Sequence, residues 1–297
     1  MDTTIFEGVG TAIVTPFDKK DNINFGRFEE LIDFQISNNV DAIIVCGTTG
    51  EPSTFTPEEY RSLIIKAVDF ADGRVPVIAG AGSNNTKEAI NKAKLAASLG
   101  ADGILLVTPY YNKTSQDGLV NHYKMICESV SDVPVILYNV PSRTGMTINL
   151  DTYEQLAKIE NIVAIKEASG DLSYMAKIIA RYGDRFDIYS GNDDIIVPAM
   201  SIGAKGAISV ASNVIPDVIF DMCEFCLDNN FREARRLQIS FLDLINALFM
   251  EVNPIPVKAA MKLRGFDCGS PRAPLCDLSF EKLAKLQKIM WNHGLMS

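Results

Sequence analysis

The feature that most constrains the fold is a repeat of short apolar segments along the whole chain. Eight runs rich in β-branched residues recur at the spacing of one strand followed by one helix. They cover residues 11–16, 41–47, 75–80, 102–109, 133–139, 161–167, 186–191 and 206–210. Because the runs are continuous rather than alternating, they indicate parallel strands covered on both faces.

Amphipathic patterns separate these runs and predict helices. They cover residues 25–39, 57–71, 86–99, 117–129, 150–159, 172–182 and 195–202. Thr56 and Pro57 form a helix start, and Gly100 suits a left-handed helix end. Eight such units predict an α/β fold, a (β/α)₈ TIM barrel. An open doubly wound sheet is the competing fold, but "GAGSNN" at 80–85 lacks the third glycine of a dinucleotide-binding fingerprint.

The last part of the chain has helical patterns only, at 216–227, 231–249, 256–263 and 279–293. The first can complete the barrel, and the others predict a C-terminal helical appendage. We therefore expect a catalytic barrel over 1–228 and an α-helical domain over 229–297. The broad apolar face of helix 231–249 is interpreted as a core or subunit contact.

Composition excludes several classes of function. The net charge is −9 and no basic run occurs, so nucleic acid is not an expected partner. No apolar run is long enough to cross a membrane, and the N-terminus does not resemble a signal peptide, so we expect a cytoplasmic protein. Cys223 and Cys226 share a helical face and no second pair follows, so we expect no metal site. An acidic protein that binds anions needs cations placed inside a pocket.

Reactive side chains gather where the predicted strands end, which is where barrel enzymes carry their chemistry. These endings lie at residues 47–51, 108–112, 138–145, 166–168 and 190–193. Lys166 ends the sixth strand, where its amine faces the barrel mouth among apolar side chains. Poor solvation there lowers the pKa of the amine and frees it to form a Schiff base with a carbonyl. The alternative is a surface lysine paired with Glu167, but neighbours on a strand face opposite ways.

Hydroxyl groups surround this lysine in the predicted barrel. Tyr138 ends the adjacent strand, where a phenol can pass protons; the alternative is a core tyrosine. Thr48 and Thr49 lie between glycines and can offer hydroxyl and N–H groups to a carboxylate, or simply form a capped turn. Arg143 suits a bidentate grip on a second carboxylate, or a loop salt bridge. Asp193 and Asp194 are expected only to cap the following helix.

Six motifs together resemble the dihydrodipicolinate synthase family, one of the pyruvate-dependent class I aldolases that include N-acetylneuraminate lyase. They are "GTTGE" (47–51), "VTPYYNKTSQDGL" (107–119), "YNVPSRTG" (138–145), "IKEASGD" (165–171), "SGND" (190–193) and "NPIPVK" (253–258). The resemblance covers nearly the whole chain. It implies a 4-hydroxy-tetrahydrodipicolinate synthase, a lyase of lysine and diaminopimelate biosynthesis that condenses pyruvate with L-aspartate 4-semialdehyde without cofactor or metal.

The resemblance also implies a role for each site residue. Lys166 would form the Schiff base, and Tyr138, Thr48 and Tyr111 would form a proton relay. Tyr111 would reach in from a neighbouring subunit, which implies at least a dimer and, within the family, a homotetramer. The pyruvate pocket would be formed by Thr49, Ile208 and Gly191, and Arg143 would hold the carboxylate of the second substrate.

Lysine-inhibited members of the family bind lysine at a subunit interface. The corresponding positions here include Ser53, Asn84, Glu88 and Tyr110, which form a possible effector site. Pro57 and Tyr60 replace histidines of inhibited relatives, so we predict weak or absent inhibition.

Three alternative functions remain to be weighed. The first is N-acetylneuraminate lyase or a related 2-keto-sugar-acid aldolase. The second is a non-catalytic barrel that senses a 2-oxo acid, although such a protein does not need a proton relay. The third is a metal-dependent barrel aldolase, which the shortage of histidines disfavours.

Overall fold

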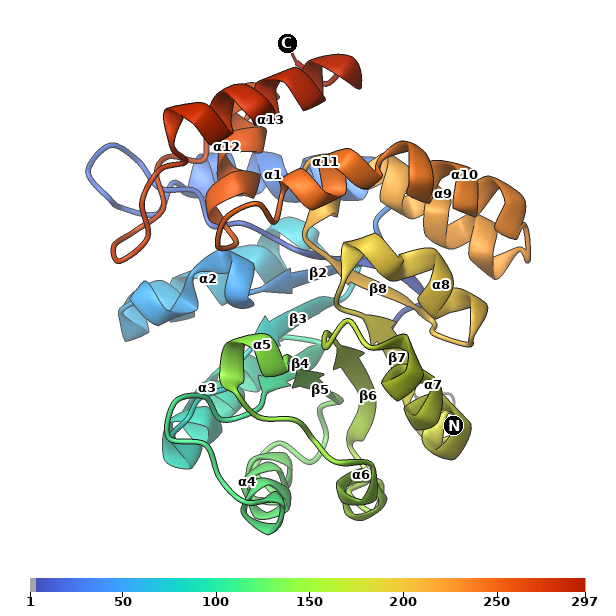
Figure 1. The fold of residues 1–297 in the computed structure, drawn as a ribbon. Helices are drawn as coiled ribbons and strands as arrows, with labels where there is room; N and C mark the ends of the chain where they lie inside the picture. Colours follow the sequence, from blue (N-terminus) through green and yellow to red (C-terminus); the bar gives the residue numbers. More distant parts are fainter. Residues whose placement is uncertain (1–3, 297) are drawn as a thin grey trace.

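Eight parallel strands close into one barrel in chain order (Figure 1). The computed structural model describes residues 4–296. Its strands are β1 (Gly8–Ala12), β2 (Ala42–Val45), β3 (Val77–Gly80), β4 (Gly103–Val107), β5 (Val135–Asn139), β6 (Ile162–Glu167), β7 (Asp187–Ser190) and β8 (Gly206–Ser209). Pairing of β8 with β1 closes the ring. The barrel prediction is confirmed, and the open sheet is excluded.

The first strand begins earlier than predicted. It was expected at residues 11–16, whereas β1 pairs with β2 and β8 over Gly8–Ala12. Two glycines weaken the strand pattern there; a Cβ on Gly10 would lie 2.6 Å from Ile44 Cδ1, so that side chain would have to shift. Beyond β1, the Val14 N–H leaves the sheet and donates to Asn213 Oδ1 (3.0 Å). The apolar residues at 13–16 therefore belong to the loop above the barrel.

Helices cover the outside of the ring. They are α1 (Phe25–Ser37), α2 (Pro57–Ala71), α3 (Thr86–Ser98), α4 (Gln116–Glu128), α6 (Leu150–Leu156), α7 (Leu172–Tyr182), α8 (Ile196–Ser201) and α9 (Pro216–Leu227). The short α5 (Pro141–Thr144) lies instead in the loop after β5, where Ser142 and Arg143 line a cleft at the barrel mouth. Short 3₁₀ turns occupy Thr48–Gly50, Pro52–Thr54, Asp193–Ile195 and Ala211–Asn213. The predicted start of α2 is confirmed: Thr56 caps it in a capping box with Glu59.

The C-terminal helices gather on one side of the barrel (Figure 1). They are α10 (Phe231–Ser240), α11 (Leu242–Ala247), α12 (Ile255–Leu263) and α13 (Phe280–Asn292). The prediction of a single helix over 231–249 is wrong, because the chain breaks at Phe241. There α10 stays against α8 and α9, whereas α11 turns toward α13 and the Phe241 ring stacks on His293 (4.7 Å). The domain boundary at residue 229 stays a prediction.

The core has two layers, as a barrel requires. An inner cluster fills the ring with side chains from alternate strand positions, among them Ile44, Ile136 and Ile208. A larger cluster lies between the strands and the helices. Within the described residues, no helix is long and apolar enough to cross a membrane.

Candidate active site

Strand register places Lys166 and Tyr138 side by side at the barrel mouth. Tyr138 on β5 pairs with Lys166 on β6, and Lys166 Nζ lies 4.5 Å from the centre of the Tyr138 ring. Both side chains are buried, and Lys166 is only 5% exposed. The predicted meeting of amine and phenol is present in the structure.

Burial lowers the pKa of Lys166 to about 8. The negative charge of Asp193 works against this shift, and the positive charge of Arg143 adds to it. The alternative pairing with Glu167 is excluded, because the Glu167 carboxylate accepts hydrogen bonds from Asn139 Nδ2 (2.8 Å) and the Ser169 N–H (2.7 Å) instead. An appreciable fraction of the Lys166 amine is therefore neutral and nucleophilic near neutral pH.

Burial also raises the pKa of Tyr138, so this phenol keeps its proton at neutral pH. Arg143 and a hydrogen bond with the Thr48 side chain oppose the shift. A protonated phenol that shares a hydrogen bond with a hydroxyl can both give and take a proton.

The two threonines lie on the 3₁₀ turn that follows β2. Thr49 is 2% exposed, and its Oγ1 accepts a hydrogen bond from Asn253 Nδ2 (3.0 Å). The turn closes through the Gly50 N–H, which donates to the Gly47 carbonyl (2.9 Å). Thr49 is thus held toward the barrel axis rather than toward solvent.

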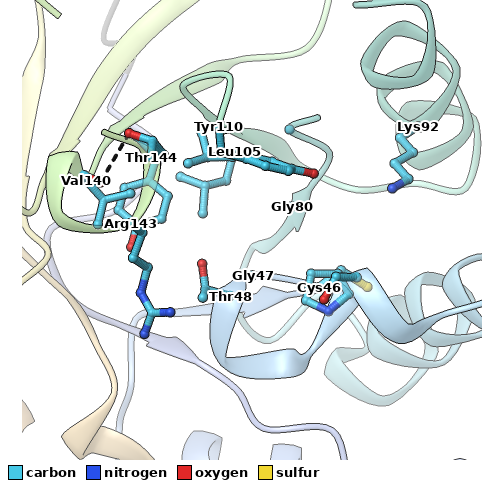
Figure 2. A pocket seen from close by; sticks show the side chains of 15 residues that line it. Cys46, Gly47, Thr48, Gly80, Lys92, Leu105, Tyr110, Val140, Arg143 and Thr144 are labelled. Atoms are coloured by element: carbon cyan, nitrogen blue, oxygen red, sulfur yellow. Dashed lines mark hydrogen bonds between the residues drawn. The ribbon is translucent and has the colours of Figure 1, made fainter. Parts of the chain in front are cut away.

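One cleft connects these groups, and it has an inner and an outer part. Thr48, Tyr138 and Arg143 line both parts. The inner part contains Lys166 and is also lined by Thr49, Gly191, Ser142, Asn192 and Asn253. Figure 2 shows the outer part, where Arg143 on α5 and Thr48 reach into one space while Lys92 lies at the far side.

Gly191 lines the inner cleft, whereas Ile208 does not. A Cβ on Gly191 would lie 3.0 Å from Lys166 Cε, so this glycine packs against the lysine stem. The Ile208 side chain is fully buried in the ring on β8. Ile208 does not line either part of the cleft, so its contribution to the pyruvate pocket stays a prediction.

Tyr111 is not brought into its own cleft. It is 91% exposed and has a left-handed backbone (φ 67°), so its phenol stands clear of this subunit. Two of the possible effector residues, Ser53 and Tyr110, line the outer cleft. The other two lie nearby: the Asn84 carbonyl accepts from Asn112 Nδ2 (3.0 Å), and Glu88 pairs with Lys92 (3.7 Å).

The role expected of Asp193 is wrong. It does not cap α8; its Oδ2 accepts hydrogen bonds from the N–H groups of Val210 (3.0 Å) and Ala211 (2.9 Å) in the next loop. The contact with Thr49 also gives Asn253 a place in the site that sequence reasoning did not assign, although "NPIPVK" marked its segment. Among residues 4–296, no three His, Cys, Asp or Glu side chains are grouped so that they could hold a metal ion.

A barrel whose mouth holds a desolvated lysine beside a protonated phenol defines an imine-forming enzyme of the aldolase type. Comparison with known proteins agrees. A sequence model of the Dihydrodipicolinate synthetase family matches residues 5–292. The chain therefore belongs to this family and is an enzyme.

Individual relatives match over almost their full length. A 4-hydroxy-tetrahydrodipicolinate synthase of Clostridium tetani is 52% identical over 99% of both chains. A crystal structure of dihydrodipicolinate synthase from Aquifex aeolicus has a TM-score of 0.95 and 42% identity over 98% of this chain and 99% of that chain. The enzyme from Acinetobacter baumannii, complexed with pyruvate, has a TM-score of 0.96 and 40% identity over 99% of this chain and 100% of that one.

Proposed function

We propose that this chain condenses pyruvate with L-aspartate 4-semialdehyde to give 4-hydroxy-tetrahydrodipicolinate, through an imine on Lys166. The observation that carries the proposal is the buried Lys166 amine, with its pKa lowered to about 8, beside the Tyr138 phenol. The name shared by the curated relatives supports the same reaction.

The reaction follows from the groups at the barrel mouth. The neutral Lys166 amine attacks the keto carbon of pyruvate, and loss of water gives an iminium. Loss of a methyl proton gives an enamine, which attacks the aldehyde carbon of the second substrate. The alkoxide formed from the aldehyde takes a proton. The amino group of that substrate then adds to the iminium carbon and passes a proton to the lysine nitrogen, so that Lys166 leaves as the neutral amine and a cyclic imine remains. The protonated imine is itself the electron sink.

Proton transfer is assigned to Tyr138 and Thr48, together with Tyr111 contributed by a neighbouring subunit. Thr49 binds the pyruvate carboxylate, with Gly191 and the backbone of Ile208 forming the same pocket. Arg143 binds the carboxylate of the aldehyde substrate, because a guanidinium can hold both oxygens at once. Because the net charge of the chain is −9, the attraction for two anionic substrates has to come from these few cations.

Borohydride reduction in the presence of pyruvate tests the central step. Peptide mapping should find a reduced pyruvate adduct on Lys166, and the Lys166→Met variant should carry none. Absence of the adduct from the wild-type enzyme would overturn the mechanism. Turnover of aspartate semialdehyde separates the synthase from a 2-oxo acid sensor, and turnover of N-acetylneuraminate would instead indicate a lyase.

Arg143 gives a separate test of the second substrate site. In Arg143→Met, the KM for aspartate semialdehyde should rise by about ten- to a hundredfold, the cost of about 1.5–3 kcal/mol for a lost charge-assisted contact. Trapping of pyruvate on Lys166 should continue. A variant with a raised KM for pyruvate and an unchanged KM for the aldehyde would reverse the assignment.

We further propose that the enzyme works in the cytoplasm, in lysine and diaminopimelate synthesis, as a homotetramer. The exposed Tyr111 supports self-association, since a relay through this phenol needs a second copy. Sedimentation measures the assembly. Mixing inactive Tyr111→Phe and Lys166→Met subunits should restore activity, because a mixed interface contains one site with both residues intact.

A further inference from the structure

A buried ion pair joins the C-terminal segment to the turn that carries the site threonines. Lys258 Nζ lies 2.8 Å from Glu51 Oε1, across 207 residues of sequence. Their side chains are 2% and 1% exposed. The second oxygen, Glu51 Oε2, accepts a hydrogen bond from the backbone N–H of Arg272 (2.8 Å). Both oxygens of this carboxylate are therefore held by the C-terminal segment.

Glu51 lies directly after the turn that contains Thr48 and Thr49, and it shapes that turn. Its backbone is left-handed (φ 63°), and its N–H donates to the Thr48 carbonyl (3.2 Å). On its other side, the Glu51 carbonyl accepts from Thr54 Oγ1 (2.8 Å). A movement of the Glu51 carboxylate is thus passed to Thr48 and Thr49 through a closed backbone turn.

The same segment holds Thr49 and Arg143 directly. Asn253, two residues before α12, donates to Thr49 Oγ1 (3.0 Å), and its carbonyl accepts from Arg143 Nη2 (3.4 Å). Lys258 lies one helical turn further, on α12. Asn253 and Lys258, which lie on one short segment, therefore fix the position of groups on both sides of the cleft.

Stability alone does not account for this arrangement. Two desolvated charges are costly, and an apolar pair of similar volume often stabilises a fold equally well. The Phe17 ring lies under both cations, 4.2 Å from Lys258 Nζ and 4.3 Å from the Arg272 guanidinium carbon, and Arg272 Nη1 binds Glu59 Oε2 (3.0 Å). The ion pair differs from an apolar contact in one respect. Because its hydrogen bonds are fixed, it allows only one orientation of the turn.

We infer that Lys258 and Glu51 are positioning residues for the reaction, through which α12 sets the geometry of the Thr48–Thr49 turn for pyruvate. The inference rests on the proposed function, since it names pyruvate as the molecule bound there. Neither residue lines the cleft, so neither touches a substrate.

Three variants test the inference: Lys258→Met, Glu51→Gln, and both changes together. The measurements are the rate of borohydride trapping by pyruvate, the KM for pyruvate, and hydrogen exchange of the peptide containing residues 47–51. Each variant should trap roughly ten- to a hundredfold more slowly, as expected for a small displacement of binding groups. Exchange in the turn should rise. The double variant should regain thermal stability, because no unpaired charge remains buried, yet trapping should stay slow.

Asn161→Ala is the matched control. Asn161 precedes β6 at the opposite end of the barrel, where its Nδ2 donates to three backbone carbonyls, those of Cys127, Val130 and Val133. Its loss should lower stability while leaving the KM for pyruvate and exchange in the turn unchanged.

Two outcomes overturn the inference. One is a double variant whose trapping rate and KM for pyruvate equal those of the wild type. The other is an Asn161→Ala variant in which trapping slows as much as in the ion-pair variants. If the single variants do not fold, the double variant decides. Failure of the wild-type enzyme to form any adduct would instead refute the proposed function, and exchange in the turn would still report whether the ion pair orders it.

Discussion

At the scale of single residues, the role proposed for Lys166 carries a cost in stability. Burial lowers its pKa from 10.5 to about 8, so the folded chain binds this proton more weakly than the unfolded chain. Below pH 8 the folded state holds a desolvated charge. The same desolvation supplies the neutral amine that the proposed mechanism requires.

The Lys166→Met variant should therefore be inactive but more stable than the wild type. At pH 7 the gain in the free energy of unfolding should approach about 3 kcal/mol, the equivalent of the pKa difference between the two states. As pH rises from about 8 to 10.5, the free energy of unfolding of the wild type increases by this difference. The stability gain of the variant should therefore shrink over that range. Chemical denaturation at several pH values measures it; a gain that does not change with pH would show that packing, not charge, is responsible.

The Tyr138→Phe variant isolates the proton relay from binding. It removes one hydroxyl from a buried ring and keeps the aromatic contact with Lys166. We expect kcat to fall by about 10²–10⁴-fold, the usual contribution of a positioned acid–base group. The KM for pyruvate should change far less. A kcat within twofold of the wild type would remove Tyr138 from the relay.

At the scale of elements, the junction of β6 and β7 fixes the lysine stem. Gly191 follows β7, and a Cβ there would lie 2.6 Å from Ala168 Cβ and 3.0 Å from Lys166 Cε. Contacts this short require the backbone or the lysine to move. The lysine stem can therefore keep its position only because residue 191 has no side chain.

The Gly191→Ala variant should slow pyruvate trapping and destabilise the fold by roughly 1–3 kcal/mol, as overpacking in a dense region does. Gly73→Ala is a matched control for glycine loss: apart from its chain neighbours, a Cβ at residue 73 would have no atom within 4 Å, although φ is positive there at +68°. Trapping measured by mass spectrometry separates the two variants. Equal rates for both would mean that residue 191 does not constrain the lysine.

The sequence predicts elements better than it predicts side-chain contacts between them. Continuous apolar runs were enough to locate the strands, and Lys166 could be placed at the mouth because a strand end is a local property. Glu51 and Lys258 are different. Their pairing depends on how α12 returns to the barrel at a sequence separation of 207, and no periodicity records that return. Asp193 was missed for the same reason, since its partners lie in the following loop.

At the scale of the whole molecule, several large aromatic side chains are exposed on the surface of the single chain. Tyr111, Phe280 and Trp291 are 91%, 88% and 72% exposed. The ends of α13 and the loop after β4 therefore carry apolar surface that the single chain leaves exposed. The loop after β4 carries both Tyr110, a possible effector residue, and Tyr111, the proposed relay residue.

Lysine should inhibit this enzyme weakly or not at all. Pro57 begins α2 and has no side-chain donor, and the Tyr60 hydroxyl already donates to the Gly80 carbonyl (3.0 Å). The outer cleft also contains a cation of its own: Lys92 Nζ lies 5.6 Å from the centre of the Tyr60 ring and 3.7 Å from the Glu88 carboxylate. A second ammonium would meet repulsion there, and the carboxylate it needs is already paired.

Initial rates with millimolar lysine measure this directly, and they should match the rates without lysine. Lys92→Leu removes the resident charge and frees Glu88, so this variant should bind lysine more tightly than the wild type in calorimetry. Lys87→Leu, on the same helix, is the matched control for loss of a charge, and it should leave binding unchanged. Strong inhibition of the wild type would contradict the prediction. Equal lysine binding by the wild type and Lys92→Leu would show that Pro57 and Tyr60, rather than the resident cation, account for the insensitivity.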